Sequence, residues 1–309
     1  MTLPAFIDAA ELSQLLPMSA AIDALETAFS ADRLPEAPQR THVAVQDADL
    51  LMMPAAGELG AGVKIVTVNP ANPERGLPLI HGMYVLFAPG TLKTVGIIDG
   101  AAITGLRTAA VSGLATRWLA RDDARRLVVY GAGTQARSHL EAMRAVRPIE
   151  EVRVVSRSAG PAEELADAVR SARLDAAVAG PDAVAGADIV CTCTTSSTPV
   201  FDGTKVDEGT HINAVGAYRP GARELDDHVV SKARIVVETR DAALSEAGDL
   251  IIPMQAGVIG RDDVVADLSE VVRGTPVRRE QDDITVFKSV GVAFEDLVVA
   301  RAAFDRLGA

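Results

Sequence analysis

The 309-residue chain is poor in cysteine, aromatic residues and lysine: it has two cysteines, one tryptophan and 4% aromatic side chains. Cys191 and Cys193 lie two residues apart, so they fall on one face of an expected strand and are too close for an ordinary disulfide. A metal site is the alternative, but no cluster of histidine or cysteine accompanies the pair. The pattern therefore favours buried thiols, with no bound metal, in a cytoplasmic protein.

The chain also lacks long apolar runs and clusters of basic residues. No apolar run reaches the roughly 18 residues expected of a membrane-spanning helix, and the N-terminus lacks the basic and apolar regions of a secretory signal. The net charge is −12, and no basic stripe interrupts this acidic balance. These absences argue against nucleic acid or an anionic membrane as a partner.

The hydrophobic content is 48%, which is enough for a sizeable core and favours two domains over one. In residues 1–119, Asp8 and Ser19 are candidate N-caps of two short helices, and Thr104 is a candidate N-cap of a third. Short β-branched runs, separated by glycine and proline clusters, predict an antiparallel sheet. Its expected strands are residues 41–46, 50–53, 62–69, 79–87 and 94–99.

From residue 120 to residue 288, strand-like runs alternate with helices or loops. This alternation predicts a doubly wound parallel sheet. The expected fold class is therefore α/β, with a Rossmann domain and an α+β domain for substrate binding and dimerisation. A final helix is expected from Ser289 to Leu307. The predicted strands of the parallel sheet are residues 127–130, 152–156, 188–193, 211–215, 234–238 and 284–287.

Lys64, one of only five lysines, stands in an otherwise apolar run that predicts a strand. A lysine in a largely buried strand is costly unless it is paired or has a lowered pKa. Both conditions suit chemistry, because a desolvated lysine can bind a carboxylate, transfer a proton or form a Schiff base. The alternative is an edge strand whose lysine reaches water.

Two arginines are candidate partners of Lys64. Arg107 follows Thr104 at an expected helix start, where a cation opposes the helix dipole, and a bound anion would resolve that conflict. Arg40 precedes the first strand of the sheet, and by itself it is equally consistent with a surface arginine. Together the three cations would form a pocket for a carboxylate, facing a nicotinamide held by the second domain.

A glycine-rich turn joins the run at 127–130 to a helix, as in the GxGxxA dinucleotide fingerprint. The first glycine permits the turn, the second lets a pyrophosphate approach the backbone, and the helix N-terminus supplies N–H donors. A merely structural turn is the alternative, but the alternating strands that follow favour nucleotide binding. The fingerprint residues are Gly131, Ala132, Gly133, Thr134, Gln135 and Ala136.

The end of the next strand bears on the choice between NAD and NADP. An acidic residue normally stands there to bind the ribose 2′-hydroxyl of NAD, but this chain has Ser156, Arg157 and Ser158. A guanidinium flanked by two hydroxyls suits a 2′-phosphate, which favours NADPH over NADH. An exposed arginine in a site that takes NAD is the alternative.

The chain resembles the ornithine cyclodeaminase/mu-crystallin family over nearly its whole length. The family's motifs occur here as several long stretches in the right order, which makes the resemblance specific. The matching stretches are residues 63–70, 76–78, 103–110, 131–136, 213–216, 246–250 and 285–291.

The resemblance implies a homodimer with a shared β-structure and a C-terminal helix, 289–309, that returns to the first domain. It also implies that Arg40, Lys64 and Arg107 bind the substrate carboxylate, with Lys64 as the catalytic proton donor. The cofactor contacts that it implies are Arg107, Thr108, Ala132, Gly133, Thr134, Gln135, Ser156, Arg157, Ser158, Thr194, Val215 and Ser289, beside Gly131 of the turn.

One departure from the family pattern concerns the substrate. Ornithine cyclodeaminases carry an aspartate two residues after the motif at 213–216, where this chain has Tyr218. That acid serves deamination, so its replacement argues against ornithine chemistry while leaving hydride transfer intact. The following residues, 219–225, are more similar to the mu-crystallin and ketimine-reductase branch.

These observations predict an NADPH-dependent reductase of cyclic ketimines, an oxidoreductase acting on CH–NH bonds. Δ1-pyrroline-2-carboxylate and Δ1-piperideine-2-carboxylate are the expected substrates, giving L-proline and L-pipecolate. Three alternatives stay open: ornithine cyclodeaminase, an alanine dehydrogenase-like enzyme, and a non-enzymatic ligand-binding protein of the mu-crystallin kind. The intact Lys64 and phosphate loop argue against the last, because pure binding needs neither.

Overall fold

A computed structural model describes residues 4–308, so residues 1–3 and Ala309 of the expected first domain lie outside the described part. The chain divides into two compact units. The first runs to Ala110 and resumes at Val292, and the second comprises Val111–Gly291. The first division falls inside a helix, nine residues before the domain boundary expected from the sequence, because one continuous helix begins in the first unit and ends in the second.

The first unit is built on a six-stranded sheet, antiparallel except for one edge pair. The five strands predicted from sequence are confirmed, and Ala5–Ile7 adds a short sixth strand that pairs in parallel with the last of them. The strand order is β1-β6-β5-β4-β3-β2. The strands are β1 (Ala5–Ile7), β2 (Thr41–Val45), β3 (Ala48–Gly57), β4 (Gly60–Val68), β5 (Ile80–Phe87) and β6 (Thr94–Asp99).

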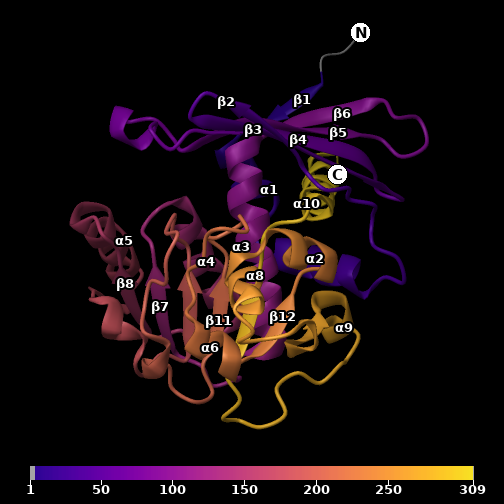
Figure 1. Cartoon of the computed structure of the whole chain (residues 1–309). Helices are drawn as coiled ribbons and strands as arrows, with labels where there is room; N and C mark the ends of the chain where they lie inside the picture. The colour runs from indigo at the N-terminus through magenta and orange to yellow at the C-terminus, as the bar shows by residue number, and fades with distance from the viewer. Residues whose placement is uncertain (1–3, 309) are drawn as a thin grey trace. The chain divides into compact units, whose positions relative to one another are not determined.

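Three helices of this unit, α1 (Ala9–Leu15), α2 (Met18–Ser30) and α10 (Ala293–Leu307), lie on the same face of the sheet (Figure 1). Phe29 of α2 meets Phe294 of α10 edge to face, with ring centroids 5.1 Å apart. The α10 helix also packs on β3, β4 and β5. This packing places the first turn of α10 directly against the strands that carry the candidate site.

The predicted helix starts have different outcomes. Asp8 caps α1 in a reciprocal capping box with Glu11, as expected. Ser19 is not a cap, because α2 begins at Met18 after Pro17, which lacks a side-chain cap bond but has a fixed φ. A short 3-10 turn, Pro73–Arg75, follows β4.

The Thr104 prediction is also wrong. The α3 helix (Gly100–Leu119) begins four residues earlier, where Asp99 accepts a hydrogen bond from the Ala102 N–H at 2.7 Å. Thr104 is internal, with its hydroxyl bonded to the Gly100 carbonyl. Arg107 is therefore in the interior of α3, where the dipole of the helix end no longer acts.

The second unit is a parallel sheet of eight strands, which confirms the predicted α/β class. Its order is β13-β12-β14-β11-β10-β7-β8-β9. The six strands predicted from sequence are present, and β9 and β13 at the two edges were missed. The strands are β7 (Arg126–Tyr130), β8 (Glu151–Val155), β9 (Asp175–Val178), β10 (Ile189–Thr192), β11 (His211–Ala214), β12 (Arg234–Val237), β13 (Val264–Asp267) and β14 (Thr285–Lys288).

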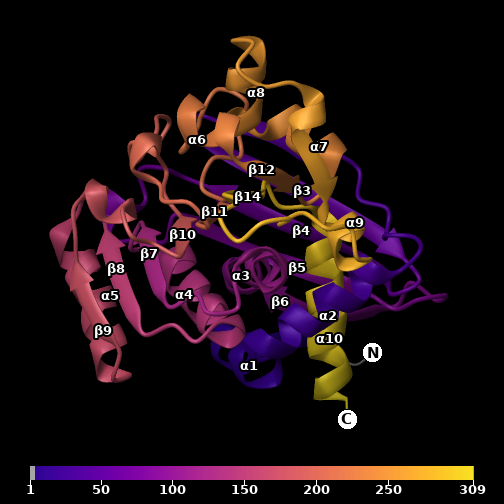
Figure 2. The ribbon, with the colours of Figure 1, turned by 90° about the horizontal axis from the view of Figure 1, so that it is seen from below.

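Helices cover both faces of this sheet (Figure 2). One face buries apolar side chains of the central strands against α6, α7, α8 and η2. The other face meets α4 and the second half of α3, where Asn213 of β11 donates to the Thr116 hydroxyl of α3. The helical segments are α4 (Thr134–Val146), α5 (Ala159–Ser171), η2 (Pro181–Val184), η3 (Gly203–Lys205), α6 (Asp227–Lys232), α7 (Arg240–Glu246), α8 (Gly248–Gln255), η4 (Arg261–Asp263) and α9 (Leu268–Val272).

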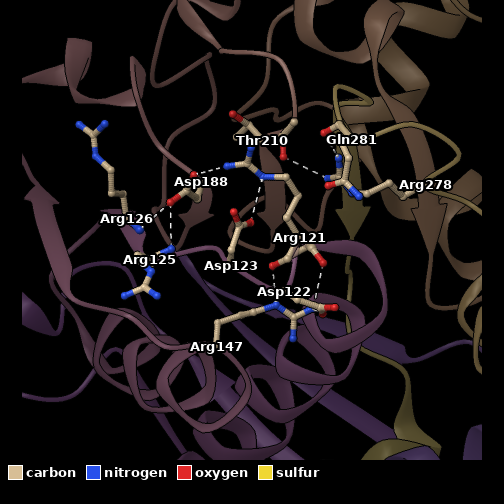
Figure 3. Close-up of polar contacts among 12 residues, drawn as sticks. Arg121, Asp122, Asp123, Arg125, Arg126, Arg147, Asp188, Thr210, Arg278 and Gln281 are labelled. Atoms are coloured by element: carbon tan, nitrogen blue, oxygen red, sulfur yellow. Dashed lines mark hydrogen bonds and ion pairs between the residues drawn. The ribbon is translucent and has the colours of Figure 1, made fainter.

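Two arginines of the second unit hold the carboxyl end of α3. Figure 3 shows one of them, Arg147, beside Arg121 and Asp122, which follow that end. Buried Arg147 donates to the carbonyls of Arg117, Ala120 and Arg121 at 2.8–2.9 Å. Arg278 donates to the carbonyl of Leu119 at 2.8 Å. Cations at a helix C-terminus complement its dipole and bind carbonyls that have no partner in the helix. Within residues 4–308, no helix is both long enough and apolar enough to span a membrane.

Candidate active site

Lys64 is buried in the middle of the first unit's sheet. Strand β4 pairs with β3 and β5, and Lys64 stands opposite Met53 on one side and Tyr84 on the other. Its relative exposure is 1%. The edge-strand interpretation is therefore wrong, and the lysine needs a partner inside the protein.

That partner comes from the first turn of α10. Lys64 Nζ lies 3.0 Å from Oδ1 and 2.9 Å from Oδ2 of Asp296. Arg107 Nε lies 3.3 Å from Asp296 Oδ1, and Arg107 Nη1 lies 3.1 Å from Glu295 Oε2. Both carboxylates are fully buried. Two cations and two anions thus form one continuous buried network.

Burial and charge act in opposite directions on Lys64. Desolvation, followed by the charge of Arg107, lowers the pKa of Lys64 from 10.5 to about 8, while Asp296 raises it and Arg40 adds a small lowering effect. The three cations expected from sequence therefore lie near enough to interact. Burial, then the charge of Asp296, raises the pKa of Tyr84 well above its usual value, so this phenol stays neutral.

The sequence interpretation missed Glu295 and Asp296. Two acids in the first turn of a helix satisfy the helix dipole and are usually solvated, so they carried no signal of a site. The available signal was their context, because Phe294, Leu297 and Val298 surround them with apolar residues on every side of the helix. Both acids form ion pairs with Arg107.

The glycine turn of the second unit has the geometry that its fingerprint requires. Gly131 has φ +112°, and a Cβ there would come within 2.5 Å of the Cys193 carbonyl oxygen. Gly133 precedes α4 without any side-chain cap bond, and among the described residues nothing lies within 4 Å of its Cβ position. The first N–H groups of α4 are thus open to an anionic ligand, and the turn fits a pyrophosphate.

The other expected cofactor residues of this unit lie at the carboxyl ends of neighbouring strands. The order β14-β11-β10-β7-β8 places them along one edge of the sheet, where the direction of winding changes between β7 and β10. Arg107 and Thr108 belong to α3 in the first unit instead. The edge residues are Ala132, Thr134 and Gln135 after β7, Ser156, Arg157 and Ser158 after β8, Thr194 after β10, Val215 after β11 and Ser289 after β14.

Two buried glutamates that sequence reasoning missed hold these loops. Glu224 accepts bonds from the Thr194 hydroxyl at 2.6 Å, the Thr194 N–H at 2.8 Å and the Gly216 N–H at 2.7 Å. Glu238 accepts from the Ser289 hydroxyl at 2.6 Å. The protons of both hydroxyls are therefore used internally, and their oxygens remain able to accept bonds.

A buried ion pair lies beneath the same loops. Lys288 Nζ is 2.8 Å from Asp249 Oδ2 and also donates to the carbonyls of Ala214 and Ala217. Burial raises the pKa of the Glu224 carboxyl, and the charge of Lys288 opposes that shift. The ammonium group of Lys288 is bound to these three oxygens, so we interpret Lys288 as a residue that stabilises the loops.

After β8, Ser156 accepts a bond from the Ser158 N–H at 3.3 Å, and Arg157 is exposed between them. Tyr218 is half-buried, packs on the apolar core of the second unit, and has the Arg219 guanidinium 5.6 Å from its ring centroid. The position that would carry a deaminating acid thus holds an aromatic ring.

A doubly wound sheet with a phosphate-binding turn, joined to a unit that buries a paired lysine, defines a two-unit protein of the Rossmann dinucleotide-binding class. The chain belongs to the ornithine cyclodeaminase/mu-crystallin family, whose model matches residues 4–309. The resemblance inferred from the motifs is therefore confirmed.

Individual relatives are similar over nearly the whole chain. A Δ1-pyrroline-2-carboxylate reductase of Bacillus cereus is 38% identical over 287 residues, 90% of this chain and 88% of the relative. The solved Δ1-pyrroline-2-carboxylate reductase of Thermococcus litoralis, in complex with NADH and L-proline, has a TM-score of 0.92 at 34% identity and covers 97% of this chain and 96% of its own. An archaeal alanine dehydrogenase dimer with bound NAD also has a TM-score of 0.92 at 34% identity, with 98% and 95% covered.

Proposed function

We propose that this protein is an NADPH-dependent reductase of cyclic ketimines, converting Δ1-pyrroline-2-carboxylate and Δ1-piperideine-2-carboxylate to L-proline and L-pipecolate. The observation that carries the proposal is the buried Lys64, ion-paired at 2.9 Å and held beside Arg107. A reductase needs a proton donor beside a carboxylate-binding cation, and these residues supply both. The similarity to two pyrroline-2-carboxylate reductases supports the choice of substrate class.

In this proposal the substrate carboxylate binds Arg40 and Arg107. Guanidinium groups suit carboxylates because they donate two parallel hydrogen bonds. The bond from Arg107 to Glu295 holds this guanidinium in one orientation before the substrate arrives. The carboxylate anchors the ring so that its imine nitrogen reaches Lys64.

Lys64 acts on the imine nitrogen in its protonated form. An iminium accepts hydride far more readily than a neutral imine, so donation of the Lys64 proton lowers the barrier. With a pKa of about 8, most Lys64 side chains carry this proton at neutral pH. The nicotinamide cofactor, when bound, supplies the hydride.

We propose NADPH rather than NADH as the preferred cofactor. Strand β8 is followed by Ser156, Arg157 and Ser158, without an acidic residue to bind a ribose 2′-hydroxyl. The exposed guanidinium of Arg157 and the two hydroxyls suit the additional phosphate of NADPH.

The chain also forms a homodimer in this proposal, through the outer face of the six-stranded sheet. The helices of this unit cover the opposite face (Figure 1), while the outer face exposes 59% of Phe6, 50% of Val45 and 45% of Met83. Apolar patches of this kind mark association surfaces, and a symmetric copy would cover the same residues on both chains. By strand register, its apolar members include Phe6, Val43, Val45, Leu50, Met52, Val63, Ile65, Met83, Val85, Phe87 and Ile97.

The similarity to an alanine dehydrogenase favours one second candidate, the reductive amination of a keto acid. A substrate panel separates the two. NADPH oxidation is measured with each cyclic ketimine and with pyruvate plus ammonia. Ammonia release is measured separately with L-ornithine and NAD, because cyclodeamination regenerates NAD and leaves no net reduction to follow. We expect rapid turnover of the ketimines and no ammonia from ornithine, since Tyr218 stands where the deaminating acid would be. Faster turnover of pyruvate plus ammonia, or robust ornithine deamination, would overturn the proposal.

A further inference from the structure

Asp296 has no part in the proposed chemistry, yet it makes the closest polar contacts of Lys64. Both of its oxygens lie within 3.0 Å of Lys64 Nζ, and it is fully buried on α10. Burying a carboxylate costs desolvation free energy, which must be offset by ion pairs and hydrogen bonds with neighbouring groups. Its neighbours here are the proposed proton donor and, at 3.3 Å, the proposed carboxylate-binding Arg107.

The groups that face Lys64 come from four places in the fold. They are Asp296 on α10, Arg107 on α3, Arg40 before β2 and Tyr84 on β5. The two arginines disfavour a charged lysine, and Tyr84 stays neutral. Asp296 is the group that favours the charged form, both through its charge and through its hydrogen bond.

We propose that Asp296 is a positioning residue for the reductase reaction, which holds Lys64 protonated and directs its ammonium group. Glu295, its neighbour on α10, orients Arg107 in the same way through a 3.1 Å bond. This inference rests on the proposed function, because it gives Asp296 a task only where Lys64 must donate a proton. Asp296 thus supports proton transfer by Lys64, and Glu295 supports carboxylate binding by Arg107.

The matched substitutions are Asp296→Asn and Glu295→Gln, which remove charge while preserving shape. In the Asp296→Asn variant the pKa of Lys64 falls, so the alkaline limb of kcat/KM for ketimine reduction moves to lower pH by about one unit or more. In the Glu295→Gln variant KM rises because Arg107 loses its orientation, while the alkaline limb stays in place. An Asp296→Asn limb that coincides with wild type would overturn the inference.

A second measurement does not depend on activity. The chain has five lysines, so selective ¹³C labelling at Cε gives few NMR signals, and Lys64→Met assigns that of Lys64. The titration midpoint of Lys64 should be lower in Asp296→Asn than in wild type, and equal midpoints contradict the inference. If wild type reduces no ketimine, the proposed function fails, and this titration still decides whether Asp296 maintains the charge of Lys64.

If the Asp296→Asn variant does not fold, the Asp296→Glu variant provides an alternative test. It keeps the negative charge but lengthens the side chain, so the direction of the ammonium group changes while its protonation does not. We expect kcat to fall at least about tenfold with the alkaline limb in place, a loss of about 1.4 kcal/mol of transition-state stabilisation. Unchanged kcat would show that the geometry around Asp296 is irrelevant and would overturn the positioning role.

Discussion

Lys64 is tolerated in a buried strand because an acid from a distant part of the chain, 232 residues later, reaches it. Sequence reasoning identified the lysine, because its cost in an apolar run can be judged locally. It could not identify Asp296, since the burial of that acid depends on how α10 packs on the sheet. Lys64, which needs a partner, was thus easier to predict than Asp296, the partner itself.

Replacing Lys64 with methionine should abolish ketimine reduction while the protein stays folded and still binds NADPH. The reason is the loss of the proton donor, which typically contributes roughly 10²–10⁴-fold in rate. Steady-state kinetics with Δ1-pyrroline-2-carboxylate, together with a fluorescence titration of NADPH, measure the two effects. Near-full activity in the variant would remove Lys64 from the mechanism.

The wild-type pH profile follows from the same residue. Burial lowers the pKa of Lys64 to about 8, and the proposed proton donor is its protonated form. The rate should therefore be sustained below about pH 8 and fall as the pH rises through that value. A kcat/KM that keeps rising between pH 7 and pH 9.5 would contradict this assignment of the proton donor.

Arg157 should determine cofactor preference. Wild type should bind NADPH at least about tenfold more tightly than NADH, which corresponds to about 1.4 kcal/mol from one charge-assisted contact. Arg157→Ala should narrow this gap by weakening NADPH alone, and the exposed Arg144→Ala is the charge-matched control. Equal affinities of wild type for the two cofactors would refute the prediction.

At the scale of elements, α3 shows what a sequence pattern can and cannot specify. The position of Arg107 was misjudged because α3 begins at Gly100, directly after the strand whose last residue, Asp99, caps it. Gly100 and the small residues after it give no periodic apolar signal, so the sequence pattern favours the next hydroxyl, Thr104, as the helix start. The missed strands β9 and β13 have four residues each, too few for a clear alternation.

The anchoring of α3 by Arg147 leads to a stability prediction. Arg147→Ala removes the donors of three carbonyls at the helix end and should lower the free energy of unfolding by about 2–4 kcal/mol. Urea denaturation followed by circular dichroism measures this change, with Arg144→Ala as the control expected to stay within about 0.5 kcal/mol. Equal midpoints for the two variants would show that the Arg147 bonds add nothing to stability.

At the scale of the whole molecule, the fold class could be predicted from sequence because each half of the chain has one consistent pattern of secondary structure. Alternating strands and helices predict a parallel sheet, and glycine-punctuated strands predict an antiparallel one. The glycine turn predicts a phosphate site without any tertiary information. Partners of buried charges, by contrast, depend on contacts between segments far apart in the chain, which no local pattern encodes.

The outer face of the six-stranded sheet should make the protein a dimer at micromolar concentration, twice the 32.3 kDa of one chain. Met83→Glu places a charge in that face and should yield monomers, because burying an unpaired carboxylate is costly. Light scattering measures the mass, and Val265→Glu, at an exposed position of β13, is the control that should remain dimeric. A monomeric wild type would exclude the proposed surface.

The central claim, hydride transfer to the carbon of a cyclic imine, is tested most directly by isotope transfer. The protein is incubated with Δ1-pyrroline-2-carboxylate and NADPH in which both nicotinamide C4 hydrogens are deuterium, and the product is analysed by mass spectrometry and NMR. We predict L-proline that carries one deuterium at Cα. The absence of proline, or proline without deuterium at that carbon, would contradict the assignment of this protein as a ketimine reductase.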